Sequence, residues 1–300
     1  MYDVAIIGGG PAGVTAAIYA ARKKLKTLFL TKDIGGQIVW TSDIENYPGF
    51  KSIKGDELAI KFEEHLKEFE IDTKRETAEE VTKENNVFKI KTKKNMYESK
   101  TVVIATGRKP RELGVKGETE FKNKGVAYCA TCDAPLFEGK DVAVMGGGNS
   151  ALEAVMQLMK IANKIYIFDF MDKMIADPIM LDKAKASKKV ELYTSSKAKE
   201  IKGDKTVKSI VIDHNGKEKE YKIEGIFVQI GSLPSDKPTI KGINLNKFNE
   251  IIINEKCETN IQGLFAAGDI TNVPEKQIIV AAGQGCIASI SAFKYLTIQK

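Results

Sequence analysis

The stretch Gly8-Gly9-Gly10-Pro11-Ala12-Gly13 decides the fold of this chain. It follows the apolar run YDVAII (2–7), which reads as a buried parallel strand, and it opens an alanine-rich stretch (11–24) typical of a helix. The next apolar run, KTLFLT (26–31), completes a strand–helix–strand unit. Glycines at this spacing allow a tight turn and let a pyrophosphate approach the positive end of the helix. The sequence therefore predicts a dinucleotide-binding unit. Its cofactor-binding glycines are Gly8, Gly10 and Gly13, with Asp33 as an acidic candidate after the second strand.

A second glycine-rich turn, Gly146-Gly147-Gly148-Asn149-Ser150-Ala151, repeats this pattern. It follows a strand (141–146), opens a helix (149–162) and leads to another strand (164–170), so the chain carries a weak internal repeat. Proline and glycine mark linkers at 108–116 and 230–238. We therefore expect an α/β fold of two Rossmann-like domains with a three-layer ββα architecture, the second inserted into the first. Residues 1–112 and 239–300 form the discontinuous domain, and residues 113–238 form the other.

Three further segments belong to the first domain. The charged, alternating region 72–100 suits an antiparallel meander, TVVIATG (101–107) reads as a strand, and the C-terminal part holds a strand (263–267) and a helix (277–296). Asp269 follows Gly268 at the end of that last strand, where an aspartate of a flavoprotein can bind the ribityl chain. Amides at the start of the helix near Gln277 stabilise negative charge on a reduced flavin. The alternative for Asp269 is a plain turn.

Two cysteines, Cys129 and Cys132, stand between the glycine-rich turns, and Asp133 follows at once. Such a pair can close a small disulfide ring, and a thiolate of low pKa can exchange with another disulfide or attack a flavin. One cysteine must then react with the flavin and the other with the substrate disulfide, while Asp133 can protonate a leaving thiolate. We therefore assign Cys129, Cys132 and Asp133 as the catalytic residues of a flavin disulfide oxidoreductase. The alternative is a packed CxxC turn.

Composition limits the other classes of function. The chain has 300 residues, of which 43% are hydrophobic and 29% charged, as expected for a soluble protein of two domains. No apolar stretch approaches the roughly 20 residues of a membrane span, and a strand at residue 2 leaves no room for a signal peptide. We therefore expect a cytoplasmic protein that binds neither nucleic acid nor a membrane. Four cysteines and two histidines are too scattered for a zinc ribbon, so we expect no metal site. The net charge of +6 suits an acidic protein partner or reflects a lysine-rich proteome.

The chain resembles the low-molecular-weight thioredoxin reductases over essentially its full length. The matching segments are GGGPAG (8–13), GGQ (35–37), ENYPGF (45–50), ATG (105–107), CATCD (129–133), GGGNSALEA (146–154), AAGD (266–269) and AGQGC (282–286). The resemblance implies FAD, a homodimer, thioredoxin as partner, and a central domain that rotates so that the dithiol alternates between flavin and thioredoxin. It implies that Cys132 faces the flavin and Cys129 attacks thioredoxin. The cofactor-binding residues that it adds to the three glycines of the first turn are Pro11, Ala12, Gln37, Asn46, Thr106, Gly107, Gly268, Asp269, Gln277 and Ile278.

One segment departs from that family. NADPH-dependent members follow the second Rossmann strand with arginines that hold the 2′-phosphate, whereas this chain has FDFMD (168–172) there. A carboxylate repels a phosphate, so we expect that NADPH is not the donor. Asp169 stands about 20 residues after the second turn, where an acid accepts the 2′-hydroxyl of NAD, which favours NADH.

Other features favour a different donor. The phenylalanines beside Asp169, Asn149 in place of the family's aspartate, and the basic net charge resemble members that take electrons from ferredoxin. We therefore prefer reduced ferredoxin as the electron donor of a flavin-dependent thioredoxin reductase, with NADH as the alternative and a donor of another kind as the third. A flavin-binding protein without enzymatic activity is a remote alternative.

Overall fold

The computed structural model of the chain describes residues 1–40, 44–234 and 237–298, which form two compact units. The first unit comprises Met1–Val39, Tyr47–Lys109 and Pro234–Lys300, and the second comprises Trp40–Asn46 and Pro110–Leu233. The chain changes unit after Lys109 and after Leu233, whereas the boundaries expected from the sequence lie at 112 and 238. The segment Trp40–Asn46, expected in the first domain, clusters with the second unit.

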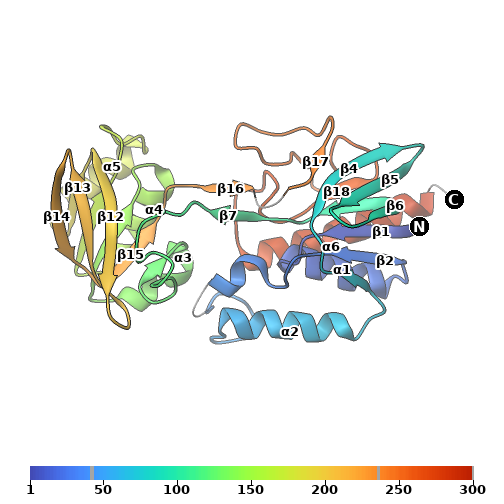
Figure 1. The fold of residues 1–300 in the computed structure, drawn as a ribbon, viewed down its shortest axis with the longest axis horizontal. Helices are drawn as coiled ribbons and strands as arrows, with labels where there is room; N and C mark the ends of the chain where they lie inside the picture. The colour runs from blue at the N-terminus through green and yellow to red at the C-terminus, as the bar shows by residue number, and fades with distance from the viewer. Residues whose placement is uncertain (41–43, 235–236, 299–300) are drawn as a thin grey trace. The chain divides into compact units, whose positions relative to one another are not determined.

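The first unit contains one mixed sheet and the helices that cover it. The strands of the sheet follow the order β17-β4-β5-β6-β1-β2-β3, with β18 paired to β6 (Figure 1). Its strands are β1 (Tyr2–Ile7), β2 (Thr27–Leu30), β3 (Asp72–Lys74), β4 (Ala78–Glu84), β5 (Val87–Thr92), β6 (Met96–Ile104), β17 (Thr239–Ile240) and β18 (Leu264–Ala266). The helices of this unit are α1 (Pro11–Arg22), α2 (Gly55–Lys67) and α6 (Ile278–Ile298), and a 3-10 helix, η1, spans Gly36–Trp40. The parallel pairs β1–β2 and β1–β6 confirm the predicted strand–helix–strand unit. Strands β4 to β6 form the predicted antiparallel meander, whereas β3 pairs parallel with β2.

Alternation along β1 divides the core of this unit between the two faces of the sheet. Val4 and Ile6 pack with the alanines of α1 and α6, whereas Ala5 and Ile7 pack on the other face. Helices α1 and α6 lie side by side (Figure 1), and a side chain at Gly285 would collide with the carbonyl oxygen of Ala12. The glycine therefore lets α6 approach the start of α1, where the first glycine-rich turn ends.

Helix α6 corrects one expectation from the sequence. Among the described residues it is the one helix that is long and apolar enough to cross a membrane, whereas no such stretch was expected. A core helix passes the same test of length and composition. Ala281, Ala288 and Ala292 of α6 are buried in the core that contains α1 and β1, so the helix is part of this core. Ile279 and Ile287 on the same helix are exposed.

The second unit has three layers. Its parallel sheet runs in the order β11-β10-β9-β15-β8, and its antiparallel sheet runs in the order β12-β13-β14. The strands are β8 (Val126–Ala127), β9 (Asp141–Met145), β10 (Lys164–Phe168), β11 (Val190–Tyr193), β12 (Ser196–Gly203), β13 (Val207–His214), β14 (Lys217–Lys222) and β15 (Gly225–Val228). The helices are α3 (Ala130–Asp133), η2 (Ala134–Phe137), α4 (Asn149–Leu158) and α5 (Pro178–Ala186). Val142 and Val144 of β9 pack with the helices, whereas Ala143 and Met145 pack with the antiparallel sheet. The predicted three-layer ββα architecture is confirmed.

Two short strands connect the units. β7 (Arg108–Pro110) and β16 (Ser232–Pro234) pair with each other, and both lie in the linkers that the sequence predicts. The positions of the strands in the antiparallel sheet β12–β14 and of the helices α2 and α5 were not predicted from the sequence. The second glycine-rich turn between β9 and α4 was predicted, and its two flanking strands pair parallel.

Candidate functional site

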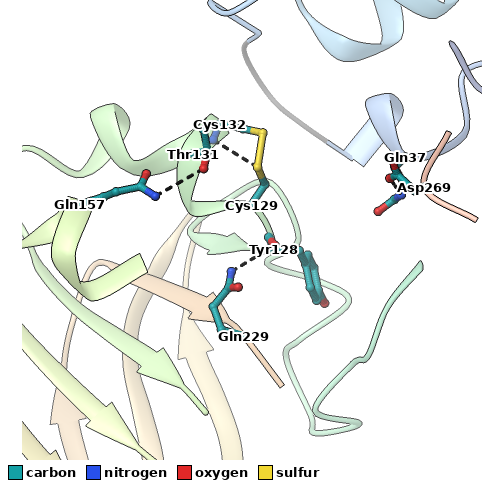
Figure 2. The surroundings of a disulfide bond; sticks show 8 residues. All are labelled: Gln37, Tyr128, Cys129, Thr131, Cys132, Gln157, Gln229 and Asp269. Carbon is teal, nitrogen blue, oxygen red and sulfur yellow. Dashed lines mark hydrogen bonds between the residues drawn. A yellow bond between two sulfur atoms is a disulfide. The ribbon is translucent and has the colours of Figure 1, made fainter. Parts of the chain in front are cut away.

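The dithiol lies at the start of the short helix α3. Cys129 and Cys132 form a disulfide, with their Cα atoms 5.3 Å apart (Figure 2). Cys129 is the N-cap residue of α3, and its Sγ atom accepts a hydrogen bond from the amide of Cys132 at 3.2 Å. A backbone amide aimed at a sulfur stabilises the thiolate over the thiol once the disulfide is reduced. The role of Cys129 as the nucleophile that attacks the partner stays a prediction.

Two glutamine side chains bind the segment that carries the dithiol, one at Thr131 between the cysteines and one at Tyr128 before them. Gln157 of α4 donates to Thr131 Oγ1 at 3.4 Å, and Gln229 donates to the carbonyl oxygen of Tyr128 at 3.2 Å (Figure 2). The hydroxyl of Tyr128 in turn donates to the buried Glu118 at 2.9 Å. Gln157, Gln229 and Glu118 carry no motif, so they were missed in the sequence.

Glu118 fixes the segment that leads into the second unit. One of its carboxylate oxygens accepts from the amide of Leu113 at 2.8 Å and from Tyr128, and the other accepts from the amide of Gly114 at 2.7 Å. Its side chain has only 3% of its surface exposed. Burial and the hydrogen bond to this carboxylate raise the pKa of Tyr128 well above its ordinary value. The tyrosine next to Cys129 is therefore held as a hydrogen-bond donor.

Asp133 is buried and lines a cavity of about 200 Å³ within the second unit. Three lysines, Lys124, Lys140 and Lys208, line the same cavity. The role of Asp133 as a general acid stays a prediction.

The two glycine-rich turns have the same backbone geometry. Gly8 and Gly146 both have positive φ, of 117° and 125°. A side chain at Gly8 would collide with the carbonyl oxygen of Ala105, and a side chain at Gly146 would collide with that of Gln229. Each first glycine thus lies against the end of a neighbouring strand. This geometry requires glycine because a residue with a Cβ atom is strained at such φ values.

The first turn leaves space for a ligand. An added Cβ atom at Gly10 would meet no atom within 4 Å, whereas one at Gly13 would collide with the carbonyl oxygen of Gly8. Asp33 is exposed, and its carbonyl oxygen lies against Gly9. Thr31, which directly follows β2, donates its hydroxyl to that carbonyl oxygen at 2.5 Å.

Asp269 and Gln37 form the polar centre of the first unit. Gln37 donates to Asp269 Oδ2 at 2.9 Å. Burial raises the pKa of Asp269, and Lys276, Gln37 and Arg108 oppose that rise. Among the described residues, the buried hydroxyl of Thr106 has no hydrogen-bond partner. A buried polar atom of this kind fits a site that a polar ligand completes.

Predicted flavin residues come together in the first unit from four parts of the chain. They are Gly8, Gly10, Pro11, Ala12, Gly13, Gln37, Thr106, Gly107, Gly268, Asp269, Gln277 and Ile278. Gly268 contacts the first turn, because a Cβ atom there would lie 3.0 Å from that of Ala12. Asn46 is the exception, since it clusters with the second unit. The residues present therefore fit a bound FAD, and the assignment of each one stays a prediction.

The second turn faces a carboxylate. Asp169 directly follows β10, has 5% of its surface exposed, and its Cγ atom would lie 2.6 Å from a Cβ atom at Gly147, with Oδ2 closer still. Burial raises the pKa of Asp169, and the amides of Met171 and Phe170 oppose that rise. Phe168 is buried beneath the sheet β12–β14, whereas Phe170 is exposed. The side chain of Phe168 therefore does not fill the turn.

The chain matches the model of the pyridine nucleotide-disulphide oxidoreductases over residues 2–285. It belongs to this family. It is 41% identical over 298 residues to an NADH dehydrogenase of Bacillus subtilis and 41% identical over 304 residues to a subunit of the alkyl hydroperoxide reductase of Escherichia coli. Each match covers 98% of the chain but 58% of the relative, so the chain spans little more than half the length of these curated relatives.

Solved structures of family members are similar to this chain over nearly its full length. A thioredoxin reductase of Streptococcus pyogenes has a TM-score of 0.92 at 37% identity, over 99% of both chains. A ferredoxin-flavin thioredoxin reductase of Clostridium acetobutylicum has a TM-score of 0.53 at 32% identity, over 99% of this chain and 98% of that one. This pyridine nucleotide-disulphide oxidoreductase is therefore an FAD-binding flavoprotein with the thioredoxin reductase fold, as the sequence predicted.

Proposed function

We propose that this flavoprotein transfers electrons from NADH to the disulfide of thioredoxin or a related dithiol protein. The proposal of NADH as the donor rests on one observation: the carboxylate of Asp169 lies against Gly147 in an intact second glycine-rich turn. An acid at this position accepts a hydrogen bond from the ribose 2′-hydroxyl of NADH and repels the 2′-phosphate of NADPH. The curated relative named NADH dehydrogenase supports the same donor.

The side chains after Asp169 add to this argument. Phe170 is 71% exposed and Met171 is 41% exposed, so neither is part of the core. Binding a 2′-phosphate needs cations that form charge-assisted hydrogen bonds, and these two positions supply none. An apolar surface beside a carboxylate suits a nucleoside without that phosphate.

The dithiol supplies the second half of the reaction. Bound FAD supplies the transfer of two electrons from the nicotinamide to the disulfide. The reduced Cys129 thiolate attacks the partner's disulfide, forms a mixed disulfide and displaces one partner thiolate, which takes a proton. The Cys132 thiolate then attacks Cys129 Sγ, which re-forms the Cys129–Cys132 disulfide and releases the second partner thiolate. Asp133 is our candidate for the proton donor.

Reduced ferredoxin, which the sequence favoured, remains the second candidate donor. The ferredoxin-flavin thioredoxin reductase of Clostridium acetobutylicum and the net charge of +6 support it. Ferredoxin would need neither the second turn nor Asp169, so variants at Asp169 separate the two donors.

The test mixes the oxidised protein without oxygen with NADH, NADPH or reduced ferredoxin and follows the visible flavin absorbance. We expect rapid bleaching with NADH, slow or no bleaching with NADPH, and loss of the NADH reaction in Asp169→Ala. Asp172→Ala is the matched control, because Asp172 is an exposed carboxylate of the same loop. Rapid bleaching by ferredoxin alone, unchanged in Asp169→Ala, would establish the other donor.

We further propose a homodimer with one FAD per chain and a cytoplasmic location. The exposed Ile279 and Ile287 of α6 and the half-exposed Tyr19 of α1 provide an apolar surface for a second copy. Analytical ultracentrifugation tests the dimer, and a charge placed at Ile287 is expected to weaken it. The partner is tested with a set of thioredoxins, glutaredoxins and peroxidase dithiol proteins, because the hydroperoxide reductases among the relatives leave its identity open.

A further inference from the structure

An ionic network lies beside the loop that carries Asp269. Glu250, whose side chain is 12% exposed, accepts from Arg108 Nη1 at 3.2 Å and lies 3.0 Å from Lys276 Nζ. Lys276 also donates to the carbonyl oxygens of Thr271 at 2.7 Å and Asp269 at 3.3 Å. One carboxylate therefore holds two cations, and one of these cations holds the Asp269 loop.

Each cation is next in sequence to residues assigned to the flavin site. Arg108 directly follows Gly107, and Lys276 directly precedes Gln277. The segment after Glu250 pairs with the Asp269 loop, because the amide of Ile251 donates to the carbonyl oxygen of Ile270 at 2.8 Å. The network thus connects three separate segments of the chain at the edge of this site.

The charges of the network complement that of Asp269. Arg108, Glu250 and Lys276 together carry one positive charge, and Asp269 carries one negative charge when ionised. Burial disfavours the ionised form and raises the pKa of Asp269, Glu250 adds to that rise, and Lys276, Gln37 and Arg108 oppose it. A protonated Asp269 would lose acceptor capacity for the hydroxyl groups of a ligand.

We propose that Arg108, Glu250 and Lys276 are positioning residues of the flavin site. Arg108 and Lys276 favour the anionic form of Asp269, which accepts hydrogen bonds from the hydroxyl groups of FAD, whereas Glu250 binds both cations and opposes that form. This inference rests on the proposed assignment of Asp269 as a flavin ligand. FAD then binds tightly above the pKa of Asp269, and binding weakens as the pH falls through that pKa.

The chain contains a matched control for Glu250. Asn246 and Glu250 exchange two hydrogen bonds, in which the amide of Glu250 donates to Asn246 Oδ1 at 3.0 Å and Asn246 Nδ2 donates to Glu250 at 2.6 Å. Asn254 and Glu258 form the same pair of bonds at 3.0 and 2.7 Å, but Glu258 is exposed. Glu250→Gln and Glu258→Gln therefore disturb equivalent turns, and only the first changes the charge near Asp269.

The experiment measures FAD release from the purified holoprotein as the pH is lowered, by the rise in flavin fluorescence. Lys276→Met raises the pKa of Asp269, so we expect half-release about one pH unit higher than in the wild type. Glu250→Gln removes a negative charge while Lys276 stays bonded to Thr271 and Asp269, so half-release moves to lower pH. Lys276→Arg keeps the charge and restores the wild-type value, and Glu258→Gln leaves it unchanged.

Opposite shifts in Lys276→Met and Glu250→Gln support the network, because a purely structural role would loosen FAD in both. Shifts in the same direction, or none in either, would overturn the inference. A wild-type protein that binds no FAD contradicts the cofactor itself. The donor is tested separately by NADH bleaching at neutral pH, so failure of the donor proposal leaves this result intact.

Discussion

The carboxylate of Asp169 fills the space that a side chain at Gly147 would occupy. Asp169 can therefore occupy this position only because residue 147 is a glycine, which has no side chain. In Gly147→Ala the carboxylate must move away from the turn, and we expect KM for NADH to rise at least about tenfold, equal to the loss of about 1.4 kcal/mol of binding. Stopped-flow flavin reduction measures this change. Gly283→Ala is the control, because its added Cβ atom meets no atom within 4 Å; an equal effect in both variants would contradict the role of Asp169.

Removal of either redox cysteine is expected to abolish thioredoxin reduction and leave FAD bound. Cys129→Ser removes the sulfur that receives the hydrogen bond from the Cys132 amide, and Cys132→Ser leaves a Cys129 mixed disulfide with no resolving thiol. Turnover, the visible flavin spectrum and mass spectrometry of the trapped complex report the outcome. Cys286→Ser, which changes a cysteine outside the disulfide, is expected to keep full turnover. Full turnover in Cys132→Ser would refute the assignment.

Replacement of Asp133 tests its role as the general acid. If Asp133 protonates the leaving thiolate, Asp133→Asn slows thioredoxin reduction by roughly 10²–10⁴-fold and leaves flavin reduction by the donor unchanged. Single-turnover measurements of both half-reactions separate the two steps. An equal loss in both half-reactions points instead to a structural role in the cavity that Asp133 shares with Lys124 and Lys140.

Much of this structure could be predicted from the sequence, because glycine spacing and apolar periodicity mark backbone geometry directly. Both glycine-rich turns and the strands around them follow from these two signals. The antiparallel sheet of the second unit gives no such signal: β14 reads KEKEYK, and Tyr221 is its only buried residue. Helix α2 begins after Lys54, which provides no side-chain cap, so its start was not marked.

The site was predictable where a motif carries the chemistry and not where tertiary contacts do. The dithiol and Asp269 stand in motifs. Asp33 illustrates the limit: β2 ends at Leu30, so Thr31, and not Asp33, directly follows the strand as Asp169 follows β10. The role of Glu118 also could not be predicted from the sequence, because it depends on backbone amides that only the fold brings close to the carboxylate.

Glu118 is expected to contribute strongly to the stability of the second unit. In Glu118→Ala the amides of Leu113 and Gly114 and the hydroxyl of Tyr128 lose a buried acceptor, which costs about 2–4 kcal/mol. A lower midpoint of urea unfolding, followed by circular dichroism, measures this loss. The exposed Glu120 provides the control, and Glu120→Ala is expected to unfold like the wild type. Equal midpoints in both variants would show that water replaces the lost acceptor.

Arginines at the exposed positions after Asp169 are expected to change the choice of nucleotide. Phe170→Arg with Met171→Arg supplies two guanidinium groups beside the second turn, and Asp169→Ser removes the charge that repels a 2′-phosphate. Because each charge-assisted hydrogen bond contributes about 1.5–3 kcal/mol, kcat/KM for NADPH is expected to rise by at least about tenfold in the triple variant, while that for NADH falls. Both side chains are exposed, so the fold tolerates the change.

The double variant that retains Asp169 is the control: it is expected to gain less NADPH activity than the triple variant, because the carboxylate still opposes the phosphate. A triple variant that gains no NADPH activity but still reduces its flavin with NADH would show that the nucleotide does not bind with its ribose at Asp169.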